Sequence, residues 1–209
     1  SATSIAAIRK HLSETIPRYL DRYGVPGVSM AVVQDGELVY TGAFGVADMA
    51  SQRPMTVDAM CRVESISKSV TAWGVMKLVQ DGAIELDAPL QRYMPDWQPP
   101  ANGFDLRNVT IRRLLSNTGG MPLGTIGEEF EPGSSMPTVV DYMRKETRLV
   151  YPPGSQFLYS NVNFNTLELL IETVTGRRFA DYMREEILQP LGMVTADFAW
   201  RESYRTAMP

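Results

Sequence analysis

The chain has 209 residues, of which 44% are hydrophobic and 21% are charged, enough for one sizeable core or two smaller lobes. Its 20 Lys and Arg against 24 Asp and Glu give a net charge of -4 without any basic block, which argues against a nucleic-acid partner. A single histidine, His11, and a single cysteine, Cys61, exclude a zinc cluster and an internal disulfide, and no apolar run approaches the roughly 18 residues of a transmembrane segment.

The first predicted elements are a helix and a tight hairpin. Apolar residues recur every three or four positions over residues 4–22, which predicts a helix that ends at Gly24. The pair Asp35-Gly36 lies between two short β-rich runs, a pattern typical of a two-stranded hairpin. Because such a hairpin is marginal alone, we expect its sheet to gain further strands, and nothing after Leu191 clearly supplies them.

The middle of the chain predicts one buried helix and a long irregular stretch. We expect Cys61 to be a small buried residue. A helical pattern over residues 65–80 ends at Asp81-Gly82, and its apolar content predicts a mostly buried helix. Residues 86–136 are rich in Pro and Gly, with only a short helical piece at 111–115. An irregular stretch of this length more often forms a site than a linker.

Two more helices are predicted near the end of the chain. An apolar stripe from Phe164 to Val174 follows a Pro-Pro-Gly turn and ends at Gly176. A second pattern covers residues 179–188 and ends at Pro190. We find no internal repeat and no low-complexity tract.

A serine and a lysine three residues apart begin the helix at residues 65–80. Ser65 and Lys68 would share one face, so the amine can reach the hydroxyl and, once desolvated and deprotonated, serve as its base. The helix N-terminus would also place N–H groups beside a developing oxyanion. The motif alone is weak, because the alternative is equally good: Ser65 as a helix cap and Lys68 as a solvated first-turn residue.

A second polar tripeptide is Tyr159-Ser160-Asn161. A phenol becomes a useful proton carrier when a lysine ammonium lies close to it, because the charge favours the phenolate. Asn161 could orient Lys68 or bind a substrate amide. For the tripeptide alone, the better interpretation is a core aromatic residue beside an Asn helix cap.

Five blocks together resemble the serine β-lactamase and penicillin-binding superfamily, most closely its class C β-lactamase, D,D-peptidase, D-aminopeptidase and family VIII-like esterase branch. The likeness extends from about Arg18 to Met193. The blocks are Val25-Pro26-Gly27-Val28-Ser29 with its hairpin, Ser65-Ile66-Ser67-Lys68, residues 110–120, residues 151–161 and residues 187–193. A chance match to five blocks in order is improbable, and the alternative of a structural helical domain with accidental motifs would need one.

The resemblance implies Ser65 as the acylated nucleophile, Lys68 as its base or proton shuttle, Tyr159 as the partner that passes the proton to the leaving group, and Asn161 as substrate-binding. It leaves open whether Lys68 or Tyr159 is the acylation base. It implies no metal and no cofactor. Asn117 stands where many relatives have histidine, and the family's third motif, Lys-Thr-Gly or His-x-Gly on a later strand, has no match after Tyr159.

The resemblance also implies the fold: α+β and β-lactamase/transpeptidase-like, an antiparallel sheet flanked by helices plus a helical lobe, with the C-terminal strands missing from this chain. We expect residues 1–209 to be one incomplete domain, with the helix and hairpin in 1–60 and a mainly helical lobe in 61–195 that carries both motifs. The chain would then be an N-terminal part, with a separate C-terminal fragment as a partner that completes the fold.

The predicted function is that of a bacterial serine hydrolase that acts through an acyl-enzyme on an amide, β-lactam or ester. Its substrate partner would be a small molecule or peptide: a β-lactam, a D-amino-acid peptide or an ester. The alternative is a non-hydrolytic penicillin-recognising sensor, or an inactive fragment of such an enzyme. The resemblance implies a periplasmic or secreted location, with a cytoplasmic one as the alternative.

Overall fold

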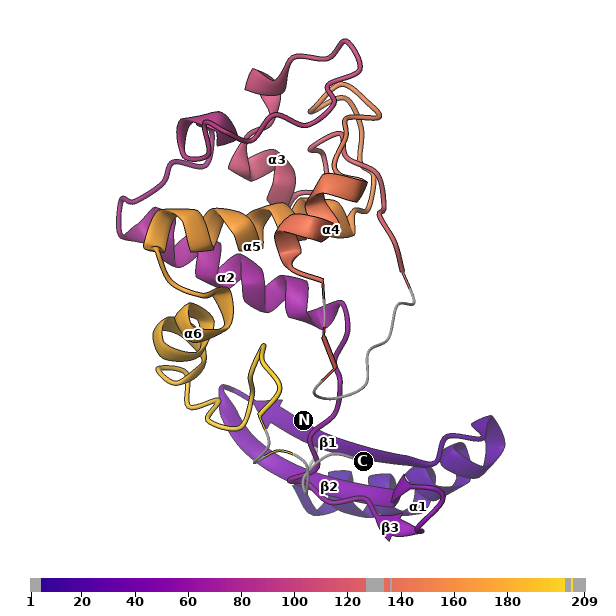
Figure 1. Ribbon diagram of the computed structural model, residues 1–209. Helices are drawn as coiled ribbons and strands as arrows, with labels where there is room; N and C mark the ends of the chain where they lie inside the picture. Colours follow the sequence, from indigo (N-terminus) through magenta and orange to yellow (C-terminus); the bar gives the residue numbers. More distant parts are fainter. Residues whose placement is uncertain (1–4, 127–133, 136, 202–203, 205–209) are drawn as a thin grey trace. The chain divides into compact units, whose positions relative to one another are not determined.

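The computed structural model describes residues 5–126, 134–135, 137–201 and 204. The chain divides into two compact units, Ser1–Arg62 with Arg201–Pro209, and Val63–Trp200. Figure 1 shows the helices and strands of each unit, coloured by their position in the sequence. The predicted division at 1–60 and 61–195 within one domain stays a prediction.

The first unit contains a helix and a small antiparallel sheet. Helix α1 (Ile5–Tyr23) ends before Gly24, as predicted, and packs against strand β2. Strands β1 (Gly27–Gln34) and β2 (Glu37–Asp48) form the predicted hairpin. Asp35 and Gly36 both have positive φ, 52° and 82°, which the tightest hairpin turns require. The two-residue strand β3 (Arg53–Pro54) pairs with β2 and was not predicted.

The second unit is helical. Its two long helices are α2 (Ile66–Gln80) and α5 (Asn161–Thr175), which pack against each other. The shorter elements, in chain order, are η1 (Leu90–Arg92), η2 (Leu106–Asn108), α3 (Ile111–Leu115), α4 (Val139–Glu146), α6 (Phe179–Met183) and the π-helical turn η3 (Arg184–Leu188). Helices α3, α4 and α6 all pack against α5, so α5 is the centre of this unit.

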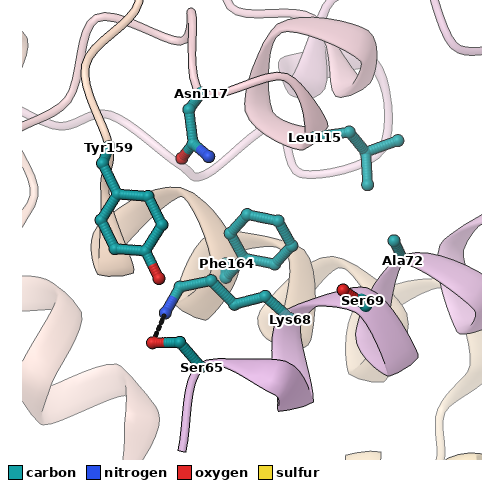
Figure 2. Close-up of a pocket in the computed structure, with 8 residues that line it drawn as sticks. All are labelled: Ser65, Lys68, Ser69, Ala72, Leu115, Asn117, Tyr159 and Phe164. Carbon is teal, nitrogen blue, oxygen red and sulfur yellow. Dashed lines mark hydrogen bonds between the residues drawn. The ribbon is translucent and has the colours of Figure 1, made fainter.

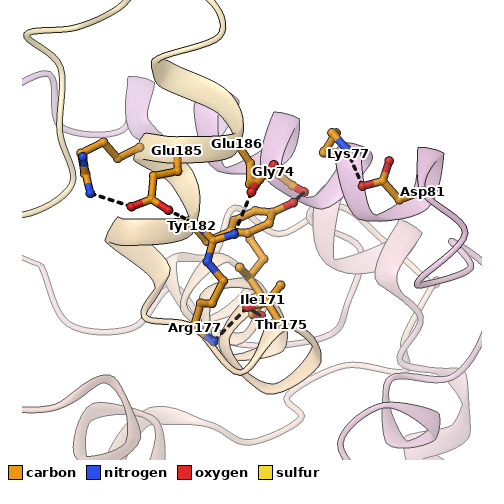
Figure 3. Close-up of polar contacts among 10 residues, drawn as sticks. Gly74, Lys77, Asp81, Ile171, Thr175, Arg177, Tyr182, Glu185 and Glu186 are labelled. Atoms are coloured by element: carbon orange, nitrogen blue, oxygen red, sulfur yellow. Dashed lines mark hydrogen bonds and ion pairs between the residues drawn. The ribbon is translucent and has the colours of Figure 1, made fainter.

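Close packing between α2 and α6 depends on a glycine. The Tyr182 hydroxyl donates a hydrogen bond to the Gly74 carbonyl at 3.0 Å, and a Cβ at Gly74 would collide with the Met183 sulfur. Figure 3 shows this bond beside the ion pairs of Arg177 with Glu185 and Glu186. These contacts hold α6 against the middle of α2 and join Arg177, just after α5, to η3.

Two expectations about burial are wrong. Helix α2 is not mostly buried, because only one of its faces meets α5 and α6 while Ile66, Trp73 and Met76 are 65%, 47% and 42% exposed. Cys61 is exposed, because it lies in an irregular segment outside every helix and strand. Sequence periodicity also missed α4, and it predicted one helix over 179–188 where the backbone changes to a π-helical turn at Arg184.

Candidate active site

The first turn of α2 brings the predicted serine and lysine together. Lys68 Nζ donates a hydrogen bond to Ser65 Oγ at 3.0 Å, as Figure 2 shows. Ser65 occupies the cap position of α2 but makes no capping hydrogen bond with its side chain. The helix-cap interpretation of Ser65 therefore does not describe this structure, and the hydroxyl is held by the lysine instead.

The backbone at this helix start also leaves a donor for an anion. The next two N–H groups are already used, because Ile66 N donates to Val63 O at 3.1 Å and Ser67 N to Glu64 O at 3.0 Å. Among the described residues, the Ser65 N–H has no acceptor. It lies at the positive end of a 15-residue helix, where negative charge is stabilised.

Tyr159 lies beside Lys68, on the segment that leads into α5. Lys68 Nζ is 4.9 Å from the centre of the Tyr159 ring, and the side chain of Tyr159 is part of the same cavity wall. Interaction with the Lys68 side chain, and then with Ser65, lowers the pKa of the Tyr159 phenol from its usual value of 10.0, against a smaller opposing effect of burial. The phenolate is therefore easier to form here than in water.

A cavity of about 290 Å³ lies beside these three residues. Its walls are Ser65, Lys68, Ser69, Ala72, Leu115, Asn117, Tyr159 and Phe164, drawn in Figure 2. Sequence reasoning missed Ser69, Ala72, Leu115 and Phe164 as wall residues. Helical spacing was a usable signal for two of them, because positions four and seven residues after Ser65 lie on the same face of α2.

Asn161 is not brought to this cavity. Its side-chain amide donates to the Thr125 carbonyl at 3.5 Å, and its backbone N–H donates to the Leu123 carbonyl at 2.9 Å. It is not among the residues of the cavity wall. Its role in binding substrate stays a prediction.

The arrangement has the groups that acyl transfer requires. A hydroxyl, a cation and a phenol of lowered pKa lie next to one another at a helix N-terminus. Within the ranges that the structure describes, no group of three His, Cys, Asp or Glu side chains could hold a metal ion. In the same ranges, no helix combines the length and hydrophobicity of a bilayer span.

Comparison with known proteins identifies relatives among hydrolases. The chain is 32% identical over 191 residues to the unguisins hydrolase ungD' of Aspergillus campestris, which covers 87% of this chain and 35% of that protein. It is 28% identical over 216 residues to the esterase EstB of Burkholderia gladioli, which covers 98% of this chain and 55% of that protein. The chain thus spans about a third to a half of the length of these relatives.

Solved structures show the same fold. A class C β-lactamase matches all of this chain and 56% of its own, with a TM-score of 0.81 at 21% identity. The octameric penicillin-binding protein homologue from Pyrococcus abyssi matches 88% of this chain and 43% of its own, with a TM-score of 0.73 at 30% identity. The predicted β-lactamase/transpeptidase-like fold is confirmed, and the partial coverage agrees with the expectation that strands of that fold are absent from this chain.

The family model described as Beta-lactamase matches residues 12–207, nearly the whole chain. The relatives named above are described as a hydrolase and an esterase. The match spans both units and includes Ser65, Lys68 and Tyr159. The chain therefore belongs to the Beta-lactamase family, within the serine β-lactamase and penicillin-binding superfamily.

Proposed function

We propose that this chain carries the acylation site of a serine hydrolase that acts on an amide, β-lactam or ester. One observation carries the proposal: Lys68 Nζ lies 3.0 Å from Ser65 Oγ and beside Tyr159, whose phenol pKa is lowered. A serine hydroxyl is a weak nucleophile until a neighbouring group takes its proton, and these two side chains are placed to do so.

Tyr159 is the better candidate for the base in acylation. As an ammonium, Lys68 would donate its hydrogen bond to Ser65 Oγ and support a developing alkoxide, while its interaction with Tyr159 lowers the pKa of the phenol and favours the phenolate as the proton acceptor. In the proposed step, the Tyr159 phenolate takes the Ser65 proton as Oγ bonds to the carbonyl carbon. The phenol then returns that proton to the leaving nitrogen or oxygen as its bond to carbon breaks.

The Ser65 N–H would stabilise the oxyanion that forms on the attacked carbonyl. The resemblance assigns the second oxyanion donor to a later strand, which this chain does not match. Losing one oxyanion donor costs about 100-fold to 1000-fold in rate. We therefore expect the chain alone to acylate slowly and to work faster with a C-terminal partner fragment.

The test is intact-mass spectrometry after incubation with a reporter penicillin and, separately, with a fluorophosphonate. We expect one adduct per chain, located at Ser65 by peptide mapping. Ser65→Ala should abolish the adduct. Ser69→Ala is the matched control, because Ser69 is a serine on the same helix and in the same cavity wall, and it should keep the adduct. An adduct that persists in Ser65→Ala, or no adduct with either probe, would contradict the proposal for this chain.

The same experiment separates the hydrolase from the alternative. A penicillin adduct that forms and then decays with release of product indicates a hydrolase. An adduct that forms and persists indicates a penicillin-recognising sensor, and an inert chain indicates an inactive fragment. Comparing β-lactam, D-amino-acid peptide and ester probes would then identify the substrate class, while the periplasmic or secreted location stays a prediction.

A further inference from the structure

The segment that carries Tyr159 is held on both sides by one residue. Leu158 N donates to the backbone carbonyl of Asn117 at 2.8 Å. Ser160 N donates to the side-chain Oδ1 of the same Asn117 at 3.1 Å. The two peptide N–H groups that flank Tyr159 therefore have acceptors on a single asparagine, far away in the sequence.

Asn117 is itself fixed from two directions. Its backbone N–H donates to the Leu114 carbonyl at 3.2 Å, which joins it to α3. Its Oδ1 also accepts a weaker hydrogen bond, of 3.4 Å, from the amide of Asn163, a fully buried residue in the first turn of α5. Asn117 has a φ of 55°, a left-handed conformation that asparagine tolerates better than most residues.

Asn117 also borders the cavity beside the residue that it holds. Figure 2 shows its amide between Tyr159 and Phe164, facing Lys68. Among the described residues, the hydrogen bonds that Asn117 accepts come from the segment of Tyr159 and from the start of α5. This geometry distinguishes Asn117 from a wall residue that only contacts substrate.

We propose that Asn117 is the positioning residue of Tyr159: by accepting hydrogen bonds from the peptides on both sides, it holds the phenol against Lys68 and Ser65. The catalytic consequence for Tyr159 rests on the proposed function, whereas the hydrogen bonds of Asn117 do not depend on it. Among the described residues, the hydrogen bonds of Asn117 run to α3, to the Tyr159 segment and to α5, not to Ser65 or Lys68, so we infer that it acts through Tyr159. Loss of the side-chain acceptor frees one side of the segment, and misplacement of a catalytic group by about 1 Å can cost about 100-fold in rate.

The variant to make is Asn117→Gly. Glycine adopts the same positive φ without strain and keeps the backbone carbonyl. The substitution therefore removes only the side chain, with the Oδ1 that accepts from Ser160 N and Asn163 and the part of the cavity wall that it forms. The matched control is Asn102→Gly, in the same unit. Asn102 has a φ of 49°, and its side chain donates to the Leu149 carbonyl at 2.7 Å, away from the cavity.

Two readouts decide the proposal. The first is the pKa of Tyr159, from near-ultraviolet titration of each variant with and without the added change Tyr159→Phe. The second is the rate of acylation by the reporter penicillin as a function of pH. For Asn117→Gly we expect the Tyr159 pKa to rise toward 10.0, because the phenol leaves the lysine, and acylation to slow by about 10-fold to 100-fold. Asn102→Gly should change neither.

Each other outcome overturns the inference. An unchanged Tyr159 pKa with a raised KM would make Asn117 a substrate contact only. The same changes in Asn102→Gly would show a general loosening of the unit, which thermal unfolding of both variants would also reveal. If the wild-type chain is not acylated at all, the proposed function fails, but the titration still decides whether Asn117 holds Tyr159.

Discussion

Two serines occupy the same position at the start of two helices of equal length, but their side chains make different contacts. Ser160 precedes α5, is fully buried, accepts a hydrogen bond from Asn163 N at 3.0 Å and donates one to the Pro122 carbonyl at 2.6 Å. Ser65 precedes α2, is exposed, and makes no capping bond. The Ser160 side chain bonds to the start of its helix, whereas the first N–H groups of α2 bond to the carbonyls of Val63 and Glu64 and not to the Ser65 side chain.

The comparison shows what stability Ser65 would forgo in the nucleophile role that we propose for it. An N-cap hydroxyl that bonds to the helix backbone contributes about 0.5–2 kcal/mol of stability. Ser65 does not make that bond, so its oxygen is available to Lys68 and to a substrate. A serine before a helix is therefore insufficient evidence for either role, and its surroundings decide which one it has.

The largest effect is expected when the contact between Ser65 and Lys68 is removed. Lys68→Met keeps the length of the side chain but removes the ammonium, the largest contributor to the lowered pKa of Tyr159. Acylation should slow by about 100-fold or more, and its rise with pH should move to higher pH, because the phenolate then forms later. Stopped-flow acylation across pH measures both.

The matched control for that variant is Lys77→Met. Lys77 lies on the same helix and pairs with Asp81 instead of Ser65. Its substitution should leave both the rate and the pH profile unchanged. Equal losses in the two variants would mean that the charge of α2, rather than the contact with Ser65, is what matters.

The second prediction concerns the interior of α5. Burial, and then the charge of Glu172, raises the pKa of Glu168 from 4.5 to about 7. The folded state therefore favours the protonated carboxyl of Glu168. The contribution of this preference to the free energy of unfolding is fully present below about pH 4.5 and is lost as the pH rises through 7. Glu168→Gln should raise the free energy of unfolding above pH 7 by on the order of 2–3 kcal/mol.

Urea unfolding at several pH values measures this effect. The control, Asp96→Asn, removes one carboxylate at an exposed position of the same unit. If Glu168→Gln and Asp96→Asn change the pH dependence of unfolding alike, Glu168 does not carry the effect assigned to it.

The third prediction tests the packing beneath the Tyr159 segment. A Cβ at Gly119 would lie 2.9 Å from Asn163 Oδ1 and 2.9 Å from Leu114 Cδ2, both too close. Gly119→Ala should therefore lower the free energy of unfolding by about 1–3 kcal/mol, as overpacked cores do. Thermal unfolding would show the loss, and an unchanged midpoint would mean that Asn163 moves aside without cost.

The smallest effect sharpens the contrast between the two serines. Ser160→Ala removes the cap of α5 and should lower the free energy of unfolding by about 1–2 kcal/mol. Ser65→Ala loses no cap and should change it by less than about 0.5 kcal/mol. Chemical unfolding of both variants measures the difference, and equal destabilisation would show that Ser65 caps its helix in solution.

Elements with local signals were predictable from the sequence. Glycines with positive φ end the helices where the pattern stopped, as at Gly24 and Gly176, and Asp35-Gly36 forms the expected turn. Ser65 and Lys68 meet as predicted, because one helical turn is enough to bring them together. These features depend on a few neighbouring residues, so their sequence is sufficient.

Features that depend on distant contacts were not predictable. Asn117 was noticed only as a departure from a family pattern, because its hydrogen bonds reach residues about 40 positions away. The Thr125 carbonyl that accepts from Asn161 lies in the irregular stretch, where sequence periodicity is uninformative. The exposed face of α2 was also missed, because an apolar helix does not reveal how many of its faces are covered.

Because the two halves of the site lie far apart along the chain, labelling of Ser65 would also report whether the chain is folded. Residues 69–158 lie between Lys68 and Tyr159, so an unfolded chain would have to close a long loop to bring them together. The turn of α2 alone presents a serine and a lysine but no phenol. Labelling of Ser65 would therefore report the population of molecules in which this unit is assembled, and it would decline with denaturant in parallel with the loss of folded protein.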